Sequence, residues 1–205
     1  MASKLVNVFL VNYIPAVATD AVDAMLEQWE RERPDLDVSA TGILGRISRI
    51  AALVDQEMDR VFQPHGLTGG DFVVLAALRR SGTPYQLTPT ALSRSMMVSS
   101  GGTTKRLDRL EARGLIRRDP DPTDRRGTLV TLTNAGLATI DTVASEHAQN
   151  EKRLVATLSP NQRKTLTRLL RELLLALEHE GLARNHRSRD PDIGSPSRAQ
   201  DKREG

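Results

Sequence analysis

The segment from Leu87 to Thr133 constrains the fold more than any other part of the chain, because two short helical patterns precede two strand-like runs there. Thr88 followed by Pro89 is typical of a helix start, since a hydroxyl caps the first free amides and proline fits the first helical position. Leu92 and Met96 supply the apolar spacing of one short helix. The segment therefore predicts a helix pair followed by a β-hairpin.

The second helical pattern begins with small and polar residues. Ser99 and Ser100 are candidate N-caps, and the first turn would then contain Gly101, Gly102, Thr103 and Thr104. Because each glycine costs a helix interior about 1 kcal/mol relative to alanine, we expect this backbone to approach a groove floor or a phosphate closely. Leu107 and Leu110 form the apolar stripe, and Gly114 ends the helix. The remaining positions carry the cations Lys105, Arg106, Arg109 and Arg113.

A basic hairpin follows. Leu115 to Asp119 and Leu129 to Thr133 are strand-like, and the segment between them, Pro120 to Gly127, is rich in turn residues. Its tip has the sequence Asp124-Arg125-Arg126-Gly127. Arginine is attracted to the potential of a narrow minor groove, whereas phosphates repel a carboxylate. We therefore expect the two arginines to contact DNA and Asp124 to orient one of them.

The distribution of charge supports this interpretation. From Thr88 to Thr131 there are nine Lys and Arg against five Asp and Glu, whereas the whole chain has a net charge of only +3. An Arg-rich hairpin alone is usually a solvated surface. Combined with the helix pair and the focused charge, it predicts binding to double-stranded DNA. The expected DNA contacts are Ser99, Ser100, Gly101, Thr103, Thr104, Lys105, Arg109, Arg125 and Arg126.

The remaining sequence predicts a mainly α fold with a small β-wing. Helices are expected over Ala16–Arg31, Gly42–Gln63, Thr68–Arg80, Asn134–Thr157 and Ser159 to about Glu180, where Gly181 would end the last one. The leucine stripe from Leu166 to Leu177 fits either packing within the chain or a dimer seam, and we favour the seam. We expect residues 1–15 to form an extension and residues 16–180 one domain, with its DNA lobe at about 64–133 and its dimerisation helices at about 16–63 and 134–180. Residues 181–205 are expected to be a disordered tail.

The sequence offers little support for an enzyme, a metal or cofactor protein, or a secreted or membrane protein. The chain contains no cysteine, and its four histidines lack metal-ligand spacing, so we expect no catalytic residues, metal or cofactor and no enzymatic activity. His147 is expected to be a partly buried helix-face residue. The apolar run that begins at Met1 imitates a signal peptide weakly, but Asn7 and Asn12 interrupt it. With no stretch long enough for a membrane span, we expect a cytoplasmic, nucleoid-associated protein.

Three motifs carry a resemblance to a known family. They are the GLIRR strand (Gly114 to Arg118), the DRRG tip (Asp124 to Gly127) and the LTNAG helix start (Leu132 to Gly136). With these motifs the chain resembles the MarR family of bacterial winged-helix regulators over roughly residues 16–179. The resemblance implies a homodimer that binds a palindromic operator, acts as a repressor and, as in many members, is released by a small ligand.

The chain is most similar to the urate-responsive branch of that family. In that branch the ligand pocket is attributed to four residues, three of which match Trp29, Arg106 and Arg118 here. The fourth, an aspartate, falls on Val73; Asp71 is rotated by about 200° on a helix and cannot substitute. The resemblance thus implies a small anionic ligand, a purine or a carboxylate, with a weak response to urate. The alternative is a ligand-blind architectural or protein-interaction winged helix.

Overall fold

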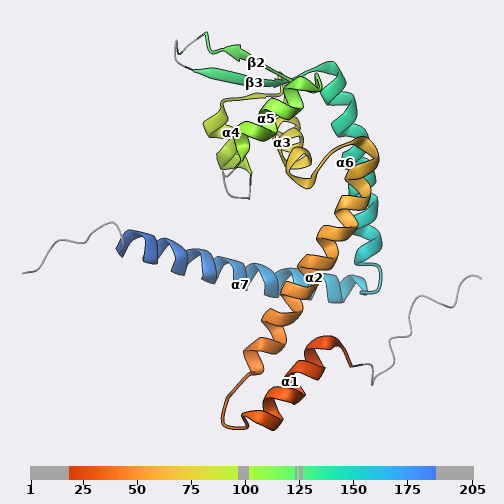
Figure 1. The fold of residues 1–205 in the computed structure, drawn as a ribbon, viewed down its shortest axis with the longest axis vertical. Helices are drawn as coiled ribbons and strands as arrows, with labels where there is room; N and C mark the ends of the chain where they lie inside the picture. Colours follow the sequence, from red (N-terminus) through yellow and green to blue (C-terminus); the bar gives the residue numbers. More distant parts are fainter. Residues whose placement is uncertain (1–18, 97–101, 123, 125–126, 188–205) are drawn as a thin grey trace, which may run out of the picture. The chain divides into compact units, whose positions relative to one another are not determined.

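The computed structural model describes residues 19–96, 102–122, 124 and 127–187, with backbone alone for 181–187. The chain divides into two units, Met1–Thr157 and Leu158–Gly205. The helices are α1 (Ala21–Glu32), α2 (Ser39–Phe62), η1 (Gln63–His65, a 3-10 turn), α3 (Gly69–Arg80), α4 (Pro89–Ser95), α5 (Thr103–Ala112), α6 (Asn134–Leu154) and α7 (Pro160–Arg187). The strands are β1 (Gln86–Leu87), β2 (Ile116–Pro120) and β3 (Thr128–Leu132). Figure 1 labels all of these elements except η1 and β1. The predicted fold class, mainly α with a small β-wing, is confirmed.

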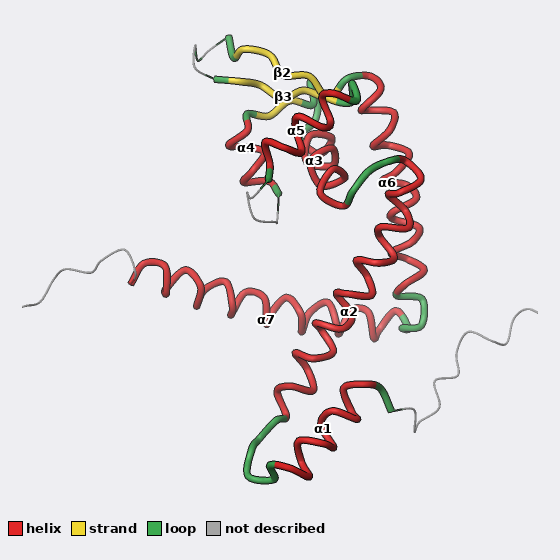
Figure 2. Tube along the Cα trace, viewed as in Figure 1, coloured by secondary structure: helices red, strands yellow, loops and turns green. Residues whose placement is uncertain are grey.

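The strands form one antiparallel sheet in the order β1-β3-β2 (Figure 2). Strands β2 and β3 are the predicted hairpin, with Arg118 opposite Val130. Strand β1 was not predicted, because two residues are too few to show the alternation that identifies a strand. It pairs with β3 through Gln86 opposite Thr131 and Leu87 opposite Val130. The sequence interpretation therefore described two strands where the described residues form three.

The core lies where α3, α4, α5, α6 and the sheet meet. Its largest fully buried side chains are Leu75, Leu78, Leu92, Leu110, Ile116, Ile140, Val74, Val130, Val143 and Asp71. His147 of α6 joins an aromatic cluster at the edge of this core, with its ring centroid 4.6 Å from that of Phe72 and 5.6 Å from that of Phe62. This placement agrees with the partly buried helix-face position predicted for His147.

Caps set the helix boundaries. The predicted capping box of α3 is present, because the Thr68 hydroxyl accepts from the Asp71 amide and the Asp71 carboxylate accepts from the Thr68 amide. A second box, formed by Asp20 and Asp23, begins α1 at Ala21 rather than at the predicted Ala16. Helix α2 begins three residues before the predicted Gly42, since the Asp37 carboxylate accepts a hydrogen bond from the amide of Ser39, its first residue.

The predicted start of α5 is wrong. The N-cap is Gly102, not Ser99 or Ser100, and the helix begins at Thr103. Gly102 has φ +82°, in the left-handed region that favours glycine. No atom within the chain lies within 4 Å of a Cβ built there. Backbone conformation, rather than close approach of another part of this chain, therefore accounts for this glycine; Ser99, Ser100 and Gly101 lie outside the described residues.

Helix α7 belongs to the second unit. Its predicted capping box is present: the Ser159 amide donates to Gln162 Oε1 over 2.8 Å, and the Gln162 amide donates to Ser159 Oγ over 3.4 Å. The predicted end at Gly181 is wrong, because the helix continues to Arg187. A single glycine without a following proline lowers helix stability by about 1 kcal/mol but does not stop propagation. None of the described helices has the length and apolar character needed to cross a bilayer.

Candidate nucleic-acid interface and ligand pocket

Helix α5 is the candidate recognition helix, and it packs against α3 and β2. Leu107 and Leu110 are buried and hold it to the core. Thr104 and Lys105 are exposed, as expected of DNA contacts. Thr103 is buried with an exposed fraction of only 9%, because it lies one turn before Leu107 on the inward face. The predicted contact of Thr103 with DNA stays a prediction, and its burial leaves the side chain less available for it than those of Thr104 and Lys105.

Arg109, a predicted DNA contact, is bonded to the inside of the lobe. Its Nη2 lies 2.6 Å from Oδ1 of Asp71, its Nε donates to the same oxygen over 3.2 Å, and Nη2 also reaches the Thr68 hydroxyl at 3.1 Å. The Asp71 side chain is only 1% exposed. Burial raises the pKa of Asp71, but the hydrogen bonds from Arg109 and Thr68 outweigh it and hold that pKa below its ordinary value.

Arg118, a predicted ligand residue, holds the wing to α5. Its Nε donates to Oε2 of Glu111 over 2.9 Å, and its Nη2 lies 2.7 Å from Oδ1 of Asp108. The Arg118 amide donates to Oε1 of Glu111 over 3.0 Å. The side-chain hydrogen bond from Arg118 lowers the pKa of Glu111. Sequence reasoning missed both carboxylates, although acids three residues apart on one helix face were a usable signal.

Arg106, the second predicted ligand arginine, lies over the first turn of α3. Its Nε is 2.6 Å from the position that a Cβ on Gly70 would occupy, so glycine makes room for the guanidinium. Its Nη1 is buried and has no hydrogen-bond partner in the described part of the chain. A buried guanidinium nitrogen without an acceptor is costly, and a charged acceptor beside it would remove that cost.

Trp29, the third predicted ligand residue, lies on α1 and is 42% exposed. Helix α1 packs on the first half of α2, where a Cβ on Gly45 would be 3.3 Å from Val22 and where Arg46 binds Asp20. Figure 1 shows α1 and α5 near opposite ends of α2. The main packing partner of α1 is α2, whereas α5 packs on α3 and β2.

The aspartate position of the urate-responsive pattern is apolar in the structure as in the sequence. Val73 is partly buried and packs against the core cluster. The carboxylate of Asp71 faces Arg109 and Thr68. This geometry agrees with the expectation that Asp71 does not substitute for the missing carboxylate.

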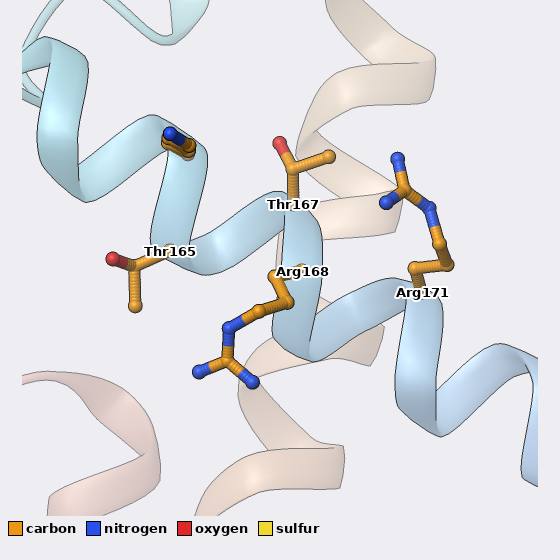
Figure 3. Close-up of a pocket in the computed structure, with 5 residues that line it drawn as sticks. Thr165, Thr167, Arg168 and Arg171 are labelled. Carbon is orange, nitrogen blue, oxygen red and sulfur yellow. The ribbon is translucent and has the colours of Figure 1, made fainter.

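Two surface hollows are lined by residues other than the predicted ligand residues Trp29, Arg106 and Arg118. One of about 510 Å³ runs along α7 and is lined by Lys164, Thr165, Thr167, Arg168 and Arg171. Figure 3 shows Arg168 and Arg171 leaving the helix in different directions, so their charges do not converge. Another, of about 320 Å³, is lined by Leu26, Glu30, Pro34, Leu36, Asp37, Val38 and Ser39. Neither contains a predicted ligand residue, and within the described ranges no cluster of acidic and histidine side chains could hold a metal.

Arg125 and Arg126, the predicted wing-tip contacts, lie outside the described residues. The described residues on either side of them are hydrogen-bonded: the Gly127 amide donates to the Asp124 carbonyl over 2.8 Å, and the Asp121 amide donates to the Gly127 carbonyl over 3.0 Å. These bonds close the base of the wing. The orienting role of Asp124 stays a prediction.

Comparisons with known proteins agree with this architecture. A model of the MarR family matches residues 65–127. The chain is 39% identical over 149 residues to the transcriptional regulator PecS of Dickeya dadantii. The matched segment covers 73% of this chain and 90% of PecS.

Two solved structures are informative about ligands. A mutant MarR from E. coli complexed with operator DNA is 30% identical, with a TM-score of 0.55 over 68% of this chain and 99% of that one. BpsR of Bordetella bronchiseptica, whose DNA binding is regulated by 6-hydroxynicotinic acid, is 28% identical, with a TM-score of 0.52 over 62% of this chain and 98% of that one.

Proposed function

Because the chain belongs to the MarR family of transcriptional regulators, we propose that it binds a palindromic operator as a homodimer, represses transcription there and is released by a small anion. Its named relatives are regulators of transcription, and it is not an enzyme. A protein with this role acts on the chromosome, so we place it in the cytoplasm.

The observation that carries DNA binding is the surface of the recognition helix beside the basic wing. Thr104 and Lys105 of α5 are exposed, and so is Arg94 of α4, the helix before it. No ion pair to Lys105 or Arg94 is found in the described part of the chain, so both charges are available to phosphates. The structure of an E. coli MarR mutant with operator DNA supports the same use of this lobe.

Operator binding is tested by fluorescence anisotropy on the DNA upstream of the gene. Lys105→Gln and Arg126→Ala should each weaken binding, and affinity should fall steeply with salt because neutralised phosphates release counterions. Lys152→Gln, which removes an exposed charge from α6, is the control and should bind like the wild type. Equal affinity of the wild type for this DNA and for random DNA would favour the architectural alternative.

The anion is proposed from Arg106. Its buried, unpartnered Nη1 lies on the helix that would enter the major groove, so an anion bound there would bias that helix. Such coupling between two sites is typically worth about 1–3 kcal/mol. The ligand named for BpsR is a planar carboxylic acid, and it supports this chemical class for a relative. We therefore propose a planar or carboxylate-rich anion as the inducer.

Ligand response is tested by titrating urate, xanthine, citrate and aconitate while following operator release and tryptophan emission. Trp29 is the only tryptophan, so its emission is free of background. We expect a weak response to urate, since Val73 offers no acceptor for a purine N–H, and a stronger one in Val73→Asp. Tight urate binding by the wild type would refute the Val73 argument. Absence of release by any anion, with unchanged binding in a folded Arg106→Ala variant, would favour the ligand-blind alternative.

A further inference from the structure

Arg109 of α5 and Arg113, the C-cap residue of that helix, lie about one turn apart and contact the same short segment of the chain. Arg109 binds the Asp71 carboxylate and the Thr68 hydroxyl. Arg113 donates to the carbonyl of Gly66 over 2.5 Å and to that of His65 over 2.9 Å. All four acceptors lie between His65 and Asp71, in the turn between α2 and α3 and the first turn of α3.

We propose that Arg109 and Arg113 are positioning residues that fix the angle of the recognition helix, and that neither contacts DNA. This proposal rests on the proposed operator binding. The apolar contacts of Leu107 and Leu110 are non-directional, so they keep α5 on the core without fixing its orientation. Two hydrogen-bonded points about 6 Å apart along the helix, at 1.5 Å per residue, fix both its position and its angle.

The charges of these arginines are already used inside the lobe. Arg109 faces a full carboxylate, and moving it to a phosphate would leave the almost completely buried Asp71 without its cation. Arg113 faces two carbonyls at the end of η1, where the partial negative charge of a helix C-terminus favours a cation. Lys105, by contrast, is exposed on the same helix.

The two roles predict different salt dependence. A residue that contacts phosphate contributes about 0.9 to the slope of log affinity against log salt, whereas a positioning residue contributes nothing to it. A positioning residue matters for the specific operator and little for random DNA, because random binding does not require one helix angle. The two roles also differ in whether lysine can replace arginine. A phosphate accepts either cation, but hydrogen bonds from both Nε and Nη2 to one carboxylate need the planar guanidinium of arginine.

The experiment measures operator and random-duplex affinity across a range of salt for three folded variants. Arg113→Gln should weaken operator binding about five- to tenfold, the loss expected for about one net hydrogen-bond contribution, and leave the salt slope and random-DNA affinity unchanged. Arg109→Lys keeps a cation beside Asp71, so the lobe should fold, yet operator affinity should fall about tenfold through loss of the two-point contact. Lys105→Gln, the matched control, should lower the slope by about 0.9.

Two results would overturn the proposal. In the first, Arg113→Gln lowers the slope of log affinity against log salt as much as Lys105→Gln does. In the second, Arg109→Lys binds the operator as tightly as the wild type. Failure of the proposed function has a different signature, since the wild type would then not prefer its upstream DNA to random DNA. The slopes on random DNA would still separate Arg113 from Lys105 in that case.

Discussion

Asp71 is the most constrained charged side chain in the described part of the molecule. It caps its own helix by accepting from Thr68, and it accepts two further hydrogen bonds from Arg109. Removing one partner of a buried pair is strongly destabilising, because the other charge is left without compensation. Because the pKa of Asp71 is lower in the folded protein than its ordinary value of about 4, ionisation of Asp71 stabilises the fold. This stabilisation is fully present at a pH above that ordinary pKa and is lost as the pH falls through the folded-state pKa.

We therefore expect Asp71→Asn to lower the free energy of unfolding at pH 7 by about 3 kcal/mol, at the low end for a buried pair because Arg109 is partly exposed to water. Urea denaturation checks this value. Repeated below pH 4, it should show a smaller difference between variant and wild type. Asp59→Asn on the exposed side of α2 should cost little at either pH. A difference for Asp71→Asn that does not change with pH would contradict the linkage argument.

At the scale of elements, the contact between α5 and the wing is formed by an edge strand. Strand β2 lies at the edge of the sheet, so half of its amides have no strand partner. Glu111 of α5 supplies the missing acceptor for the Arg118 amide and also binds the Arg118 guanidinium. The Glu111 carboxylate therefore pairs an edge-strand amide that lacks a strand partner, and it holds the base of the wing against the recognition helix.

Replacing this carboxylate should loosen the wing without unfolding the lobe. In Glu111→Ala, hydrogen exchange at the Arg118 amide should become about tenfold faster, equivalent to about 1.4 kcal/mol of lost protection. The amides of β3, which lies between two strands, are the internal control and should keep their rates. Wild-type exchange at Arg118 would mean that the Glu111 contact does not persist in solution.

At the scale of the whole molecule, apolar surface remains uncovered in the single chain. Leucines of α7 have exposed fractions between 43% and 56% at Leu166, Leu169, Leu170, Leu174, Leu175 and Leu177. Apolar residues of α2 are also exposed, namely Ile43, Leu44, Ile50 and Leu53. Each helix by itself exposes more large apolar side chains than a solvated helix needs, which is typical of an interaction site, and this supports the proposed homodimer.

We expect replacement of Leu170 and Leu174 by glutamate to halve the mass measured by light scattering or to unfold the chain, since two charges would be placed in the apolar seam. Lys164→Glu introduces the same glutamate into α7 at a position that is already charged and exposed, and it should leave the dimer intact. A well-folded wild-type monomer at micromolar concentration would contradict the homodimer. The spacing of recognition helices in that dimer should be near 34 Å, one turn of DNA.

Local signals in the sequence determined most of the DNA-binding lobe. Hydroxyl caps followed by proline or an acid, apolar steps of three and four, and the period change after Gly114 all act over a few residues, so they predicted α3, α4, β2 and β3 without tertiary information. The start of α5 was missed because Gly102 acts through its left-handed backbone, which sequence spacing does not reveal.

The tertiary structure alone decided what each arginine does. The sequence predicted a DNA contact for Arg109 and the family resemblance implied a ligand contact for Arg118, but the partner of Arg109 lies 38 residues away, and no local pattern identifies it. The requirement for Gly136 is also tertiary, because only the folded chain shows that a Cβ there would clash with the Leu115 carbonyl oxygen. Caps and periodicity depend on neighbours along the chain, whereas ion pairing and close packing depend on neighbours in space, so the sequence determines the elements and the fold determines which charges remain available to DNA.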